Sequence, residues 1–90
     1  MTVYDRRCVI KDLQDVRREL AALKRDAAHF GGLGDAFWAK ALAAEIAGED
    51  EDAEMNHAFA EAMYGESVEA QTRRRLALDI CRLLEKELTQ

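Results

Sequence analysis

The side chains best suited to chemistry are carboxylates gathered in the middle of the chain. Five of six consecutive positions are acidic, at Glu49, Asp50, Glu51, Asp52 and Glu54. A helix N-terminus favours such a cluster, because its dipole stabilises each exposed carboxylate by about 0.3–1 kcal/mol. Together with Glu45, the cluster could instead bind a basic groove of a partner, either pairing with Lys and Arg or imitating nucleic-acid phosphates. A calcium loop fits poorly, since Met55 stands where the EF-hand turn requires glycine.

Glu54 and His57 have the i, i+3 spacing with which ferritin-like helical bundles bind iron. On a helical wheel, both residues fall away from the apolar face formed by Met55, Phe59 and Met63. We expect them to point to water rather than into a bundle core. The sequence therefore predicts no metal centre and no other cofactor.

Motifs for nucleophilic or phosphate chemistry are missing from the sequence. It has no Gly-x-Ser-x-Gly turn and no glycine-rich phosphate loop. The two cysteines, Cys8 and Cys81, have neither a CxxC spacing nor a histidine in a motif. We predict a protein that is not an enzyme, with both cysteines as free thiols in a reducing cytoplasm; a disulfide is the alternative.

The net charge of −5 is unevenly distributed along the chain. Residues 1–30 carry seven basic and five acidic side chains, residues 31–70 one and ten, and residues 71–90 five and three. Nucleic-acid binding gains affinity by neutralising phosphates, which an acidic helix after residue 50 would repel. Three consecutive arginines, Arg73 to Arg75, diverge by about 100° per helical position and cannot line one groove. We predict no direct binding to nucleic acid.

A long amphipathic run organises the first third of the chain. From residue 9 to residue 30 the apolar residues alternate in steps of four and three, the pattern of a coiled-coil seam. On its flanks, Asp12 would face Arg17 of an identical parallel helix. Glu19 and Lys24 repeat this match one heptad later. We therefore predict self-association, as a homodimer, through Val9, Leu13, Val16, Leu20, Leu23, Ala27 and Phe30. The alternative is that another helix of the same chain covers this seam.

Glycines divide the chain into four apolar stretches, and there is no proline. Thr2 and Asp5 resemble a capping box that starts a helix near Val3. The glycines at 31, 32 and 34 predict a chain reversal, and Gly48 and Gly65 predict two further helix ends. The expected helices cover about residues 3–29, 35–47, 51–64 and 67–90. We predict an all-α fold, a bundle of two long and two short helices in a single domain of residues 1–90.

The last of these helices, capped by Ser67, is expected to pack antiparallel against the first. Its apolar arc is wide enough to contact two neighbouring helices. The arc consists of Leu76, Ala77, Ile80, Cys81, Leu83, Leu84 and Leu88.

Two aromatic residues are candidates for a binding surface. Phe37 and Trp38 are consecutive in a helix, so they point about 100° apart and cannot face the same core. One interpretation is that the bundle buries one ring and the edge of the other. If Trp38 is exposed instead, with Leu33 and Leu42 beside it, it would anchor a partner, because Trp leads the residue types found at binding hot spots. Tyr64 is the second candidate.

No stretch of the sequence approaches eighteen apolar residues, and no apolar signal-peptide core follows the charged first residues. We expect a soluble cytoplasmic protein that does not bind membranes. The favoured function is non-enzymatic binding of another protein, as an adaptor, regulator or inhibitor. The alternative is an acidic inhibitor that occupies the nucleic-acid groove of a basic partner. Salt-sensitive binding would favour the second function, and binding that depends on Trp38 would favour the first.

Overall fold

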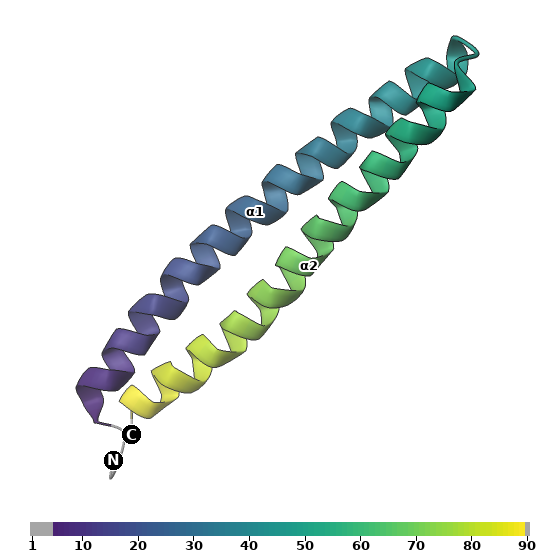
Figure 1. The fold of residues 1–90 in the computed structure, drawn as a ribbon. Coiled ribbons are helices and arrows are strands. Elements are labelled where there is room, and N and C mark those ends of the chain that lie inside the picture. Colours follow the sequence, from purple (N-terminus) through teal and green to yellow (C-terminus); the bar gives the residue numbers. More distant parts are fainter. Residues whose placement is uncertain (1–4, 90) are drawn as a thin grey trace.

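Two long antiparallel helices make up the computed structural model, which describes residues 5–89. Helix α1 runs over Arg6–Ile46 and helix α2 over Asp50–Leu88. They form a hairpin that measures 67 × 15 × 13 Å. The turn lies at one end of this rod, and the start of α1 lies beside the end of α2 at the other (Figure 1). The prediction of an all-α fold is confirmed.

The helix ends follow ordinary capping chemistry. Asp5 is the N-cap of α1, and its Oδ1 accepts a hydrogen bond from the backbone N–H of Arg7 at 2.5 Å. The predicted start near Thr2 and Val3 lies outside the described residues. Helix α2 has no side-chain cap, but three carboxylates in its first turn and Lys86 in its last turn complement the helix dipole.

Gly48 reverses the chain. Its φ of +76° lies in the left-handed region, which glycine enters without the steric cost that other residues meet. The N–H of Glu49 donates to the carbonyl of Ala44 at 2.9 Å, and the N–H of Gly48 donates to the carbonyl of Glu45 at 3.1 Å. This pair of bonds is a Schellman motif, which satisfies the last carbonyls of α1. The predicted helix end at Gly48 is therefore confirmed.

The two helices meet along a continuous heptad seam. In α1 the buried and half-buried residues keep the four-three alternation from Val9 to Ala44. In α2 the same alternation runs from Ala53 to Leu88. The α1 seam consists of Val9, Leu13, Val16, Leu20, Leu23, Ala27, Phe30, Gly34, Phe37, Ala41 and Ala44. The α2 seam consists of Ala53, Asn56, Ala60, Met63, Ser67, Ala70, Arg74, Ala77, Cys81, Leu84 and Leu88.

Side-chain size differs between the two sides of the seam. The fully buried positions of α2 are alanines, a serine and a cysteine, whereas α1 contributes valine and leucines toward its N-terminal half. Small residues on one helix let the backbones approach closely, and larger residues of the other fill the remaining space. Leu23 of α1 packs on Ala70 and Ala77 of α2.

The predicted bundle of two long and two short helices is wrong. The glycines at 31, 32 and 34 lie inside α1, and Gly65 lies inside α2. Glycine costs about 1 kcal/mol relative to alanine in a helix interior, which is less than the packing that a continuous seam provides. Ser67 does not cap a helix. It lies in the seam, where its Oγ donates to the carbonyl of Ala27 at 2.8 Å.

The predicted inner face of the C-terminal stretch is correct only in part. This stretch does pack antiparallel to the N-terminal half of α1, as expected. Ala77 and Cys81 are buried, and Leu84 and Leu88 are half-buried. Leu76, Ile80 and Leu83 are exposed, because the hairpin has no third helix to cover the wider part of the arc.

Candidate interaction surface

A two-helix hairpin buries one face of each helix and leaves both flanks open. Large apolar side chains outside the seam therefore face solvent. They are Ile10, Trp38, Leu42, Ile46, Met55, Phe59, Val68, Leu76, Ile80 and Leu83. Two groups stand out among them, one around Trp38 near the turn and one along α2.

The first group, which we call the Trp38 surface, comprises Trp38, Leu42 and Ile46 of α1. The spacing of four residues places them in a row along the helix. Trp38 is 44 % exposed, Leu42 is 43 % exposed and Ile46 is 89 % exposed. Trp38 is therefore exposed together with Leu42, as the second sequence interpretation expected, but Leu33, which it also placed there, is half-buried. Phe37 lies in the seam.

His57 of α2 holds the ring of Trp38 in place. The indole ring meets the ring of His57 edge to face, with centroids 4.8 Å apart and planes at 73°. The Nε2 of His57 lies 2.6 Å from Oε1 of Glu45 on α1. The imidazole is thus fixed between an aromatic ring and a carboxylate, so the orientation of Trp38 is set before any partner arrives.

Tyr64 of α2 lies next to the Trp38 surface, on the side away from the turn. Its hydroxyl donates to Oδ1 of Asp35 at 2.5 Å, and its ring lies against the backbone of Gly34. The hydrogen bond to Asp35 raises the pKa of the phenol above 10.0, because the bond exists only while the phenol keeps its proton. Trp38 and Tyr64, named separately from sequence, are therefore part of one surface, and they share it with Glu45.

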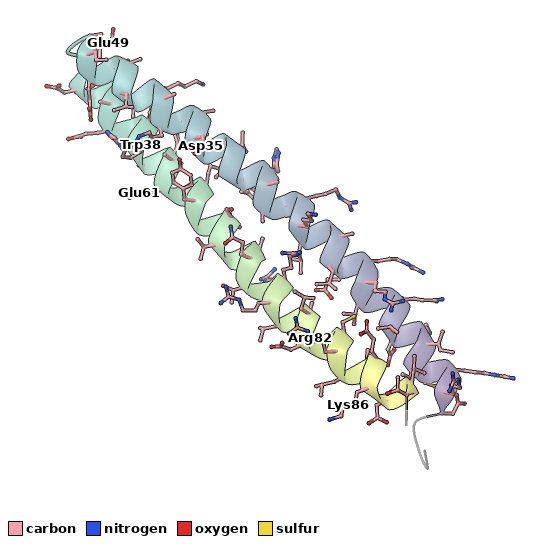
Figure 2. All side chains as sticks on the ribbon, turned by 180° about the vertical axis from the view of Figure 1, so that it is seen from behind. Asp35, Trp38, Glu49, Glu61, Arg82 and Lys86 are labelled. Atoms are coloured by element: carbon pink, nitrogen blue, oxygen red, sulfur yellow. The ribbon has the colours of Figure 1, made fainter. Side chains whose placement is uncertain are left out.

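The acidic residues of the chain gather in the half that contains the turn. Glu49, Asp50, Glu51 and Asp52 line an open depression at the turn and are exposed, as is Glu54 in the next helical turn. Figure 2 shows Asp35, Trp38, Glu49 and Glu61 in this half, with Arg82 and Lys86 toward the other end. The hairpin brings residues 31–70 together, so the unequal charge distribution of the sequence becomes a rod with one strongly acidic half.

The seven residues proposed for self-association lie between α1 and α2. Val9, Leu13 and Leu23 are buried, and Val16, Leu20, Ala27 and Phe30 are half-buried. Their flanking Arg17 donates to Glu85 of α2 at 3.4 Å. A second copy cannot occupy this seam while α2 does. Self-association through the same residues would require the hairpin to open.

The groups considered for chemistry are dispersed. Within residues 5–89 no three His, Cys, Asp or Glu side chains are placed to hold a metal ion. Glu54 does not pair with His57, which contacts Glu45 instead. Cys8 is exposed and Cys81 is buried, and both are free thiols. Burial, followed by a hydrogen bond to Glu85, raises the pKa of the Cys81 thiol.

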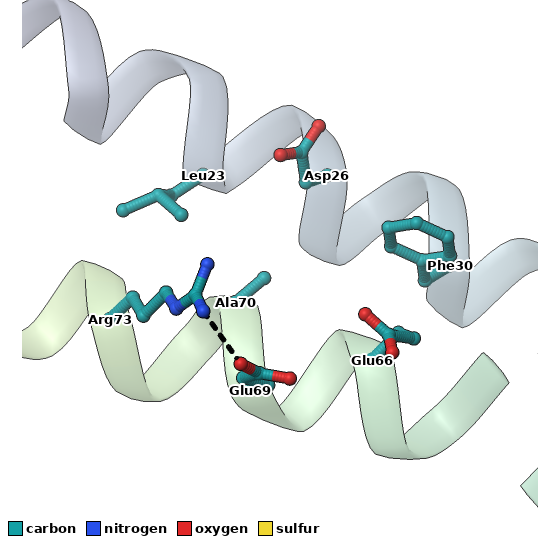
Figure 3. A pocket seen from close by; sticks show the side chains of 7 residues that line it. All are labelled: Leu23, Asp26, Phe30, Glu66, Glu69, Ala70 and Arg73. Carbon is teal, nitrogen blue, oxygen red and sulfur yellow. Dashed lines mark hydrogen bonds and ion pairs between the residues drawn. The ribbon is translucent and has the colours of Figure 1, made fainter. Parts of the chain in front are cut away.

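A small, partly open pocket lies beside the seam near the middle of the rod (Figure 3). Its volume is about 70 Å³, which is smaller than the roughly 300 Å³ at which small-molecule sites begin. On the α2 side of the pocket Arg73 donates to Glu69 at 2.8 Å, and Asp26 and Glu66 also line it. The pocket suits water rather than a substrate.

The exposed apolar stripe of α2 did not emerge from the sequence as a surface. Its members were assigned to the cores of two separate helices, since a four-helix bundle would bury them. The sequence does contain a pattern that indicates this surface. Leu76, Ile80 and Leu83 each precede by one position a seam residue, namely Ala77, Cys81 and Leu84. A helix with two adjacent apolar stripes has a second surface to cover.

Comparison with protein-family models, with curated proteins and with solved structures finds no match for this chain. Across residues 5–89, neither helix contains an apolar segment of the length needed to span a bilayer. The surfaces described above therefore carry the functional argument.

Proposed function

We propose that this protein acts without catalysis, by binding a partner protein on the Trp38 surface. The observation that carries the proposal is the row of Trp38, Leu42 and Ile46, three large apolar side chains that the hairpin leaves uncovered. A row at four-residue spacing matches the apolar face of an amphipathic helix laid alongside α1. The role is that of an adaptor, regulator or inhibitor in the cytoplasm, where free thiols such as Cys8 persist.

Charge around the Trp38 surface specifies the partner further. Asp35, Glu45 and Glu61 surround it, and residues 31–70 contain ten acidic side chains against one basic. That single cation, Lys40, lies 5.3 Å from the centroid of the Phe37 ring rather than beside Trp38. A partner helix with Lys or Arg next to its apolar face would be attracted and oriented by this rim.

The energetic centre of the interaction is expected to be Trp38. A Trp that is half exposed and already oriented can bury its remaining surface at little entropic cost. Residues of this type account for 2 kcal/mol or more at binding hot spots, on the order of a thirtyfold change in Kd. The acidic rim contributes more to the rate of association and to specificity.

Trp38 is the only tryptophan, so its fluorescence reports on this surface directly. The experiment is a titration of the full chain with a designed amphipathic helix built from Leu and Lys. We expect a blue shift of the emission as the indole leaves water, and weaker binding by Leu42→Ala. Val68→Ala removes an exposed side chain elsewhere and serves as the matched control. Equal affinity for Leu42→Ala and the wild type would disprove docking on this surface.

The salt dependence of this binding separates hydrophobic docking from the acidic groove mimic. Apolar burial is insensitive to ionic strength, whereas exposed charge pairs are screened within about 8 Å at physiological salt. We expect the replacement of Asp50, Glu51, Asp52 and Glu54 by amides to slow association and to leave most of the affinity. Loss of all binding in that variant, with Trp38→Ala unaffected, would show that the groove mimic is correct.

A further inference from the structure

We propose that a second copy of this chain covers the apolar stripe of α2, with the two α2 helices packed antiparallel about a two-fold axis near Glu69. The α2 stripe is defined here as Met55, Phe59, Ala62, Leu76, Ile80 and Leu83. It lies on the flank of the seam opposite the Trp38 surface, so this inference does not depend on the proposed partner.

The stripe has the geometry of a second helix-packing face. Its members follow steps of four and three within each half, and all six are exposed. From residue 55 to residue 83 it extends over about 42 Å at 1.5 Å per residue. Phe59 is oriented by Phe37 of α1, with ring centroids 5.2 Å apart. Helix α1 cannot cover the stripe, because α1 already fills the adjacent seam.

The stripe is nearly symmetric about residue 69. Met55 and Leu83 each lie fourteen positions away, and Ala62 and Leu76 each lie seven positions away. An antiparallel two-fold arrangement therefore places Met55 of one copy opposite Leu83 of the other. Phe59 and Ile80, ten and eleven positions away, meet in the same way. Every large apolar residue of the stripe then has an apolar counterpart.

The polar centre of the stripe selects this orientation. Between the two apolar halves lie Glu66, Glu69 and Arg73, all exposed, with Arg73 bonded to Glu69 (Figure 3). The antiparallel arrangement sets Glu66 of one copy near Arg73 of the other, and the two-fold axis makes this pair twice. Glu69 lies at the axis and faces Glu69 of the other copy, but each of these carboxylates is paired with Arg73 of its own helix. A parallel arrangement would set each of these residues against its own like charge, which is unfavourable.

The charge of the whole rod points the same way. The turn half, residues 31–70, has a net charge of −9, whereas residues 1–30 and 71–90 each have a net charge of +2. In an antiparallel dimer the acidic half of one copy lies alongside the basic half of the other. In a parallel dimer the two acidic halves would repel each other along their length.

The exposed area is sufficient for such an interface. The chain exposes 6705 Å², whereas a compact protein of its mass exposes about 5,300 Å². The difference of about 1,400 Å² exceeds the roughly 800 Å² that each partner buries in a standard interface. The extended rod as a whole therefore exposes enough surface to supply one standard interface.

The test is sedimentation equilibrium of the full chain from low to high micromolar concentration. We expect a dimer, and at least a tenfold larger dissociation constant for Ile80→Glu, since it places two charges in the interface. Val68→Glu introduces the same charge at a residue that is also exposed but lies on the other flank, so it is the matched control and should stay dimeric. Circular dichroism verifies that both variants keep their helices. A wild-type monomer throughout, or equal dimerisation of Ile80→Glu, would overturn the proposal.

Orientation is tested by exchanging the charges at the centre. Glu66→Arg alone and Arg73→Glu alone should each weaken the dimer about tenfold, because each replaces two attractive pairs by two repulsive ones. The double variant restores the pairs in an antiparallel dimer and should recover wild-type affinity. In a parallel dimer, like charges face each other in every variant, and no recovery would follow. Failure to recover would therefore exclude the antiparallel arrangement.

Discussion

Polar side chains between the two helices form hydrogen bonds from one helix to the other. The hydroxyl of Ser67 is satisfied by the carbonyl of Ala27, and the hydroxyl of Tyr64 by Asp35. Within residues 5–89, every fully buried side-chain nitrogen or oxygen has a hydrogen-bond partner. These hydrogen bonds favour the alignment of the two helices in which each donor lies opposite its acceptor.

The two thiols are expected to react at very different rates. Cys8 is exposed, whereas Cys81 lies in the seam with a raised pKa and therefore carries less reactive thiolate at neutral pH. A disulfide-exchange reagent should modify Cys8 quickly and Cys81 only after the hairpin opens. Cys8→Ser and Cys81→Ser, measured separately, assign the two phases. Equal rates in the folded protein would contradict the buried position of Cys81.

Tyr64 is expected to make the fold sensitive to alkali. The unfolded phenol ionises near pH 10.0, whereas the folded phenol keeps its proton to higher pH because it donates to Asp35. Its contribution to stability is therefore full below pH 10.0 and is lost as the pH rises through the folded pKa. Urea unfolding at a series of alkaline pH values should show this loss in the wild type and a smaller loss in Tyr64→Phe. Identical pH dependence in the wild type and in Tyr64→Phe would show that the hydrogen bond to Asp35 does not contribute to stability.

At the scale of the helices, glycines play three different parts. Gly48 makes the turn, Gly34 allows a close approach of Tyr64, and Gly32 has open space around it. The residue type alone does not distinguish these three roles, because each role depends on the residues that surround the glycine in the folded hairpin. The predicted reversal at residues 31–34 therefore failed, while the predicted end at Gly48 succeeded.

Alanine substitutions should separate these glycines. A Cβ at Gly34 would lie 2.6 Å from Cε1 of Tyr64, so Gly34→Ala should cost about 1–3 kcal/mol of unfolding free energy. Gly32→Ala meets no atom within 4 Å and should instead stabilise the helix by about 0.5–1 kcal/mol. In a Tyr64→Ala background the penalty at Gly34 should vanish, which a double-mutant cycle by urea unfolding can verify. A persistent penalty would place its cause elsewhere.

Gly48→Ala should destabilise the hairpin through the turn alone. Its φ of +76° costs a residue with a Cβ about 1–2 kcal/mol. The loss should appear in thermal unfolding while helix content is kept, because the seam is unchanged. Gly48→Asn, which tolerates the left-handed region better, should lose less. An equal loss for both substitutions would argue against the left-handed turn.

The whole molecule is extended rather than compact. Its radius of gyration is 19.9 Å, compared with about 12 Å for a compact chain of this length. A sequence with half its residues apolar normally closes around a core. The bundle of four helices was predicted because glycines divide the chain into four apolar stretches. Two-helix packing leaves part of this apolar surface open, which is the physical basis of both proposed interfaces.

Association should therefore be visible in the stability of the wild-type protein. If a second copy covers the α2 stripe, the midpoint of thermal unfolding rises with protein concentration, because dimerisation stabilises the folded state by mass action. Ile80→Glu should abolish this rise, whereas Val68→Glu should keep it. Calorimetry at several concentrations measures the effect. A midpoint independent of concentration in the wild type would contradict the dimer.

Sequence reasoning identified the N-terminal half of the seam but did not decide between α2 and a second copy as its partner. The four-three spacing from Val9 to Phe30 is a local property, and the structure confirms that this edge is a packing face. Whether α2 or a second copy covers it depends on where the chain turns. The glycines at 31, 32 and 34 led to a predicted turn at that place, whereas the chain turns at Gly48. Trp38 and Tyr64 were found as separate candidates, but their common surface with Glu45 requires the antiparallel alignment of two distant segments.

The alanine-lined seam has a thermodynamic consequence for the isolated hairpin. Methyl groups bury little hydrocarbon per residue, so the increment in heat capacity on unfolding should fall below the roughly 12–15 cal/mol/K per residue of ordinary globular proteins. The slope of its denaturation curve should be shallow for the same reason. The free energy of such a rod varies gently with temperature, and cooling harms it less than it harms a protein with a thick hydrocarbon interior.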